Sequence, residues 1–259
     1  MDATARAGLR NASLVVAAPL HLAVLELFHP HAGNVLQLDV DRWLFVHYAQ
    51  IPLFPLAAIA VAALLHGRRD LASIASRVAL FVFAVSFIAF DTAAGLVVGL
   101  LVQAAHASGD APAWRDAIDV IWRHPVVGGV RDGGTPSLSS IGALALGLAT
   151  LTAAISLRRA GRPWPPVLLL AISGWGLEVF NTHAWPGGPL TFGGIAVAAG
   201  WLQWSAARDA ARRDSPVILQ PRARLDRRSN WRPHDAHAAH ARPGPERRPG
   251  SVSLRDRLP

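Results

Sequence analysis

The chain lacks cysteine altogether and contains no lysine among its 259 residues. Without cysteine it can form no disulfide bond, no thiolate metal site and no cysteine nucleophile. Charged residues are also scarce, at 16% of the chain, whereas hydrophobic residues make up 52%. This balance is too apolar for an ordinary soluble domain and is typical of membrane proteins.

Motifs of the common enzyme classes are missing as well. The sequence contains no Walker phosphate loop, no dinucleotide-binding fingerprint, no Gly-x-Ser-x-Gly elbow and no His-Glu-x-x-His zinc motif. The formal charge of +8 does not indicate a nucleic-acid partner, because residues 206–259 hold 13 Arg against 6 acidic residues and residues 1–205 hold 12 against 11. Neither common enzyme chemistry nor specific nucleic-acid binding is therefore expected.

Long apolar runs are what the chain does contain. A helix needs about 20 such residues to cross a bilayer. The fourth run is rich in Gly, Ala, Ser, Thr and Leu, a composition that lets helix backbones approach closely. We predict an all-α, polytopic membrane helix bundle with six transmembrane helices. The predicted spans are residues 9–28, 43–65, 76–104, 136–157, 164–183 and 189–204.

Arginine alternates between the segments that join these runs. It is abundant before the first, between the second and third, between the fourth and fifth, and after the sixth. Positively charged segments stay on the cytoplasmic side during insertion, so both termini are predicted to be cytoplasmic. Tryptophans at the predicted interfaces, Trp164 and Trp201 inside and Trp43 and Trp185 outside, agree with this orientation.

The outer loop, residues 106–135, contains a predicted amphipathic helix. Within it Trp114, Ile118, Ile121 and Trp122 recur at helical spacing. Such a helix lies either on the outer membrane surface or over the mouth of the bundle.

Beyond residue 205 the apolar pattern stops. Residues 206–259 are dominated by Arg, Pro, Asp and His and cannot bury enough apolar surface to fold. We predict a disordered cytoplasmic tail whose arginines bind anionic lipid headgroups of the bilayer.

Ionisable side chains within the spans are the candidate functional residues, because each is expensive to bury in a membrane. They are His21 and Glu26 in the first span, His47 in the second, Asp91 in the third and Glu178 in the fifth. At 1.5 Å per residue, all except the deeper Asp91 lie within about 10 Å of the outer interface. They predict an outward-facing polar cavity for a small solute or a proton, of unknown identity.

Two other functions remain open. Glu26 and His29 form a Glu-x-x-His pair on one helix face, as in di-iron bundles, although no second pair exists. His21 and His47 lie at similar depth on consecutive helices and could hold a haem between them. These three histidines are the metal candidates, no cofactor is otherwise predicted, and a structural or accessory subunit is the third possibility.

Two segments carry a resemblance. They are FHPHAGNVLQLDVDRWLFVHYAQIPLFPLAAIAVAALLHG, Phe28 to Gly67, and FDTAAGLVVGLL, Phe90 to Leu101. They resemble uncharacterised multi-pass membrane proteins of high-GC bacteria, a group without an established activity. The resemblance implies a multi-pass protein of the bacterial cytoplasmic membrane, and the arginine-rich tail departs from it.

Overall fold

The computed structural model describes residues 3–31, 33–128 and 136–214, all within one compact unit that ends at Pro216. These residues form helices and their connections, with no strand among them, which confirms the all-α class. The elements are α1 (Ala3–Leu27), the 3-10 helix η1 (Val35–Gln37), α2 (Val40–Leu64), α3 (Leu71–Phe90), the π-helix η2 (Asp91–Val97), α4 (Val98–Ala107), the 3-10 helix η3 (Ala111–Trp114), α5 (Arg115–Trp122), α6 (Leu138–Arg159), α7 (Trp164–Ser173), α8 (Gly176–Val179) and α9 (Gly187–Asp214).

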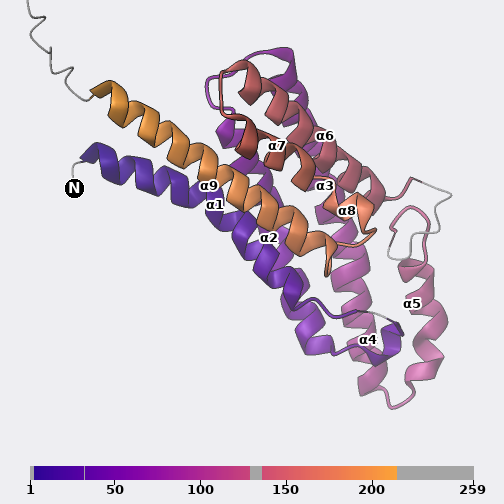
Figure 1. Ribbon diagram of the computed structural model, residues 1–259. Coiled ribbons are helices and arrows are strands. Elements are labelled where there is room, and N and C mark those ends of the chain that lie inside the picture. Colours follow the sequence, from indigo (N-terminus) through magenta and orange to yellow (C-terminus); the bar gives the residue numbers. More distant parts are fainter. Residues whose placement is uncertain (1–2, 32, 129–135, 215–259) are drawn as a thin grey trace, which may run out of the picture. The chain divides into compact units, whose positions relative to one another are not determined.

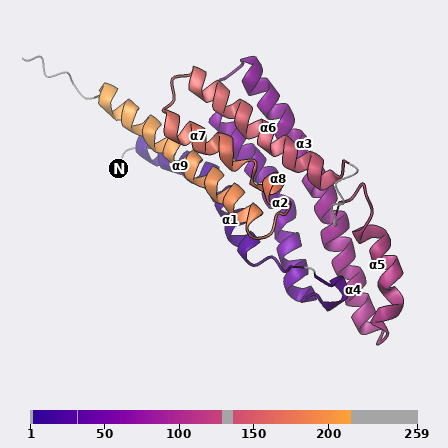
Figure 2. The ribbon, with the colours of Figure 1, turned by 45° about the vertical axis from the view of Figure 1, so that its right-hand side comes forward.

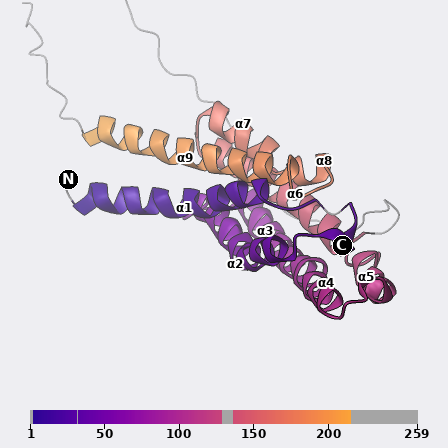
Figure 3. The ribbon, with the colours of Figure 1, turned by 90° about the horizontal axis from the view of Figure 1, so that it is seen from below.

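The long helices pack as a closed ring. Contacts join α1 to α2, α2 to α3, α3 to α6, α6 to α7, α7 to α9, and α9 back to α1. Figures 1 and 3 show α1 and α9 side by side, although they are the first and last helices of the described residues. In Figures 1 and 2, α4 and α5 lie at the end of the bundle remote from the start of α1.

Polar residues begin three of the long helices. Asp39, Asp70 and Ser137 are the N-caps of α2, α3 and α6, and each side chain accepts a hydrogen bond from a backbone N–H of the first turn, at 3.2 Å. These caps satisfy donors that the first turn would otherwise leave free.

Aromatic rings fill the interior of the ring of helices. Phe54 of α2 stacks edge-on against Phe83 and Phe87 of α3, with ring centroids 6.0 and 4.9 Å apart. Phe192 of α9 completes this cluster. Gly142 on α6 faces the ring of Phe87, where a Cβ atom would collide with it. The small residues of α6 therefore do allow close packing, as the sequence indicated.

The outward faces of the helices are apolar. Within the described ranges, three helical segments are long and apolar enough to cross a membrane: Val40–Leu64, Leu71–Ala107 and Leu138–Arg159. Large apolar side chains on these and neighbouring helices are more than half exposed. Examples are Phe45, Ile59, Phe81, Ile172 and Val197.

The remaining predicted spans look different in the structure. The apolar parts of the first and fifth are shorter, Val15–Leu27 and Trp164–Val179, and the fifth is interrupted between α7 and α8. The third is one continuous helical segment, which reaches about 55 Å at 1.5 Å per residue and so exceeds a bilayer core of about 30 Å.

The predicted tail begins too early, at residue 206, because α9 extends beyond that position. α9 continues through Ser205 and ends only at Asp214, so residues 206–214 are helical. Alanine and arginine are strong helix formers and dominate residues 206–214, and this stretch contains no proline. The rest of the predicted disordered tail lies outside the described residues.

Within residues 106–135, where an amphipathic helix was predicted, the structure has α5, which packs on the protein itself. Ile118 of α5 is fully buried in a cluster with Trp43 of α2 and Val98 and Val102 of α4. This contact favours the second of the two placements, over the bundle's own helices.

At the opposite end, two arginine-bearing connections meet. The Ser156 hydroxyl of α6 donates to Asp70 Oδ2 at 2.7 Å, and Arg68 forms an ion pair with the same carboxylate at 3.1 Å. The hydrogen bond from Ser156 is the main reason that the pKa of Asp70 lies below its ordinary value. The α2–α3 connection, which carries Arg69, and the α6–α7 connection, which carries Arg162, therefore share one end of the bundle.

Candidate metal centre

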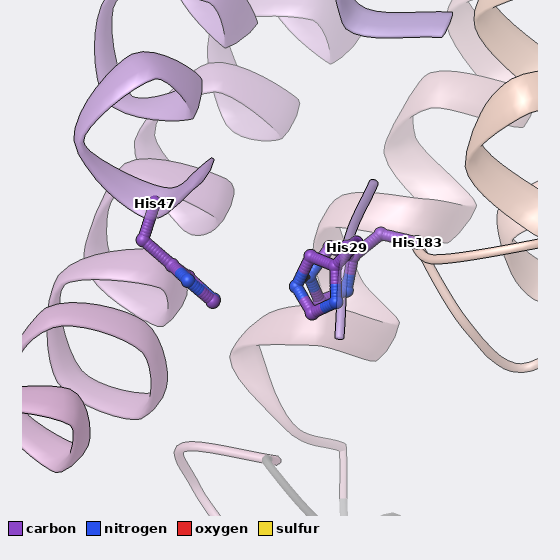
Figure 4. A group of neighbouring side chains, drawn as sticks. All are labelled: His29, His47 and His183. Carbon is purple, nitrogen blue, oxygen red and sulfur yellow. Dashed lines mark hydrogen bonds between the residues drawn. The ribbon is translucent and has the colours of Figure 1, made fainter. Parts of the chain in front are cut away.

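Three histidines from distant parts of the chain converge. His29 follows the end of α1, His47 lies on α2, and His183 lies between α8 and α9. One ring nitrogen of each lies within 4.8 Å of the others. The Nε2 atoms of His29 and His183 are only 3.1 Å apart, and Figure 4 shows His47 facing this pair from α2. We call these residues the imidazole cluster.

Backbone carbonyls orient two of the rings. His29 Nδ1 lies 2.8 Å from the carbonyl of Pro30, and His47 Nδ1 lies 2.7 Å from the carbonyl of Trp43. A carbonyl can only accept, so Nδ1 carries the hydrogen in both rings and Nε2 presents a lone pair. Histidines that bind metals are typically held by such outer hydrogen bonds.

Aromatic side chains surround the cluster. The Trp43 ring lies 4.2 Å from His47 and 5.2 Å from His29, and Phe90 lies 5.4 Å from His183, measured between ring centroids. Burial in these surroundings lowers the pKa of His29 to about 4. The His29 ring is therefore neutral at pH 7, the form that binds metal ions.

Asp91 lies beside the cluster, at the start of the π-helix η2. Its Oδ1 is 3.7 Å from His47 Nε2, and its side chain is 0% exposed. Neither carboxyl oxygen has a hydrogen-bond partner within the described part of the chain. The indole N–H of Trp43 donates to the Gly95 carbonyl at 2.7 Å and so ties this π-helix to α2. Single-turn π segments occur frequently at functional sites.

Gly95 makes the approach of His47 possible. A Cβ atom at this position would overlap the His47 ring. α2 therefore packs tightly against the π-helix at this glycine, with the imidazole as the contacting group.

A second polar layer lies one helical turn from the imidazoles. Glu26 precedes His29 by three residues and Gln50 follows His47 by three, which corresponds to about 4.5 Å along a helix. The Gln50 amide donates to Glu26 Oε1 at 2.7 Å. Among the described residues, Glu26 Oε2 and Gln50 Oε1 have no hydrogen-bond partner.

A cavity of about 170 Å³ adjoins the cluster and is lined by all three histidines. Trp122 and Phe87 form part of its wall, and the exposed residues His31 and Asn181 also line it. Its volume is below the roughly 300 Å³ at which pockets for drug-sized ligands begin. It suits an ion with its waters or a very small solute.

The structure brings together some of the predicted site residues and separates others. His47, Asp91, Glu26 and His29 belong to this region, as described above. His21 is exposed, its Nδ1 bonds to the Ala17 carbonyl at 2.7 Å, and it lines a different, apolar groove. His21 and His47 therefore do not face one haem-sized space.

Glu178 is half-buried on α8 and does not line the cavity described above. His183 is the last residue of the predicted fifth span, 164–183, but the sequence did not identify it as a ligand. In the structure it lies in the connection between α8 and α9.

Comparison with protein-family models, curated protein sequences and solved structures found no match to the chain. The function must therefore be argued from the geometry of this site.

Proposed function

We propose that this chain is a multi-pass membrane protein that binds a transition-metal ion through His29, His47 and His183. The observation that carries the proposal is the convergence of three ring nitrogens within 4.8 Å. Two ligands on one tetrahedral Zn²⁺ ion, each at 2.0–2.1 Å from it, are about 3.3 Å apart. The 3.1 Å between His29 and His183 already matches that separation. A small inward movement of His47 completes the set.

The chemistry of the ligands narrows the choice of ion. Imidazole suits Zn²⁺, Cu²⁺, Fe²⁺ and Ni²⁺, and the absence of cysteine removes the soft thiolate ligands. Three protein ligands beside a cavity leave a coordination position for water or an exogenous group. We therefore propose that the cavity, which the sequence predicts for a small solute, holds a metal ion that the protein either binds or transports.

We further propose six membrane crossings, with both termini in the cytoplasm of a bacterial cell and the imidazole cluster facing outward. Three helices long and apolar enough to span support a membrane location. The meeting of the Arg68 connection with the end of α6 supports the orientation, because this arginine-bearing end lies away from α4 and α5.

Metal titration of the purified full-length protein in lipid nanodiscs tests the proposal. Wild-type protein is expected to bind one equivalent of Zn²⁺ or Co²⁺, measured by calorimetry and by elemental analysis. His47→Ala and His183→Ala should each lose this binding, because each removes a ligand. His21→Ala, which changes an exposed histidine outside the cluster, is the matched control and should bind as the wild type does. Absence of stoichiometric binding, or unchanged binding by His183→Ala, would contradict the proposal.

A further inference from the structure

Two carboxyl groups are buried next to the imidazole cluster. Glu26 and Asp91 are both 0% exposed. Glu26 accepts a hydrogen bond from Gln50, three residues after His47, and Asp91 Oδ1 lies 3.7 Å from His47 Nε2. Burying carboxylates in this way is costly unless a positive charge accompanies them.

No arginine supplies that charge in the part of the chain that the structure describes. The ion pairs found there join Arg68 to Asp70 and Arg123 to Asp119, and leave Glu26 and Asp91 without a guanidinium partner. Arg42, near the cluster, is exposed and donates to the Phe28 carbonyl at 2.6 Å. Both Asp91 oxygens and one oxygen of Glu26 are acceptors without a donor. Oxygens of this kind, on groups fixed in a bundle interior, are suited to a cation.

We propose, on the basis of the metal site above, that Asp91 and Glu26 supply the two negative charges that balance a divalent ion held by three neutral imidazoles. The site thereby selects divalent over monovalent ions. Three neutral imidazoles alone leave a net charge of +1 with a soft monovalent ion such as Ag⁺ and of +2 with a divalent ion, so by charge they would favour the monovalent ion. With two carboxylates present, only a divalent ion leaves the buried assembly neutral, and a neutral assembly is favoured where water is excluded.

Asp91 is the carboxylate nearest the ion. Its Oδ1 lies 3.7 Å from His47 Nε2, a few tenths of an ångström beyond the separation of two ligands on one tetrahedral ion. It therefore binds the ion directly or through one water. Glu26 acts from further away and is oriented by the Gln50 amide, which donates to it at 2.7 Å.

Ion selectivity of charge-neutralising variants tests the inference. Wild-type, Asp91→Asn and Glu26→Gln proteins are titrated in nanodiscs with Zn²⁺ and, separately, with Ag⁺. Asp91→Asn should weaken Zn²⁺ binding by about 10- to 100-fold, while Ag⁺ binding stays the same or tightens. Glu26→Gln should change the Zn²⁺ to Ag⁺ ratio in the same direction by a smaller factor. Asp41→Asn, which neutralises an exposed carboxylate on α2, is the matched control and should leave the ratio unchanged.

The outcomes separate this inference from the proposed function. If the wild type binds no ion, or binds it independently of His183, the metal site itself fails. If binding depends on His183 but Asp91→Asn changes Zn²⁺ and Ag⁺ affinities equally or not at all, the metal site stands and the charge-balance inference is overturned. Size-exclusion profiles report folding. Should Asp91→Asn not fold, Glu26→Gln decides by the same criterion, and an unchanged Zn²⁺ to Ag⁺ ratio in that variant overturns the inference.

Discussion

Imidazole orientation in the cluster depends on main-chain geometry. His47 bonds to a carbonyl four residues earlier on its own helix, and His29 bonds to the carbonyl of the next residue. Such local contacts form as soon as the backbone does, so the two Nε2 lone pairs are directed before any ion arrives. Preorganisation of this kind reduces the conformational cost of binding.

Gly95→Ala should disrupt the cluster from the opposite helix. The added methyl group overlaps the His47 ring, so either the ring or the π-helix must move. We expect a loss of about 1–3 kcal/mol of stability, typical of overpacking, together with weaker metal binding. Thermal unfolding and Zn²⁺ titration measure the two effects. Gly193→Ala on α9, where the nearest atom is Ala23 Cβ at 3.7 Å, is the control and should be tolerated. Equal behaviour of the two variants would contradict this account.

At the scale of elements, residue patterns predicted some helices well and others poorly. The predicted spans 43–65 and 136–157 agree closely with α2 and α6, because long apolar runs bounded by Asp39 and Ser137 leave few alternatives. The helical segment Leu71–Ala107 is longer than the predicted span 76–104, because apolar residues continue on both sides of that range. α9 extends to Asp214, past the predicted end of the sixth span at residue 204, because a helix can continue after its apolar pattern stops.

The candidate site was predictable only in part, for a related reason. The sequence identifies Asp91, His47 and Glu26, because they are ionisable groups within apolar runs. His183 follows a break between short helices, and nothing local distinguishes it from an ordinary loop histidine. It meets His29 and His47 because the fold places the connection between α8 and α9 beside α1 and α2. A local sequence pattern does not contain such a tertiary contact. The π-helix that begins at Asp91 is likewise set by packing against Trp43.

Asp70 joins two elements at the arginine-bearing end, and its charge should stabilise the fold above its own pKa. Because the folded-state pKa is depressed, this contribution is present above about pH 4, the ordinary value, and is lost as pH falls through the lower folded value. Asp70→Asn keeps a helix cap but removes the charge. It should therefore lower the thermal midpoint at pH 7 and flatten its fall below pH 4.

Thermal unfolding in detergent at pH 7, 5 and 3 checks this expectation. Ser156→Ala should reproduce part of the effect, because it removes the main hydrogen bond to the Asp70 carboxylate. Wild type and Asp70→Asn losing stability in parallel across this range would contradict the account.

The whole molecule presents arginine-bearing connections at one end and the imidazole cluster away from them. If both termini are cytoplasmic, the connection after α4 is outside and the one after α6 is inside. The natural absence of cysteine makes this simple to examine. Asp110→Cys and Ala160→Cys both create exposed thiols, one in each connection. In intact cells a membrane-impermeant maleimide should label Asp110→Cys, and Ala160→Cys only after lysis.

The reversed labelling pattern would overturn the orientation and the outward-facing cavity together. Labelling of both positions in intact cells would instead contradict the membrane-spanning arrangement, because a barrier must separate the two connections.

The proposed function requires that one metal ion binds among the three imidazoles. The X-ray absorption spectrum of the wild-type protein loaded with one equivalent of Zn²⁺ measures this. We predict about four nitrogen or oxygen ligands at 2.0–2.1 Å, with the multiple-scattering pattern of histidine rings, and no such spectrum for His183→Ala, which should not bind the ion at this site. A spectrum of an all-oxygen, six-coordinate ion, or one unchanged in His183→Ala, would contradict the account.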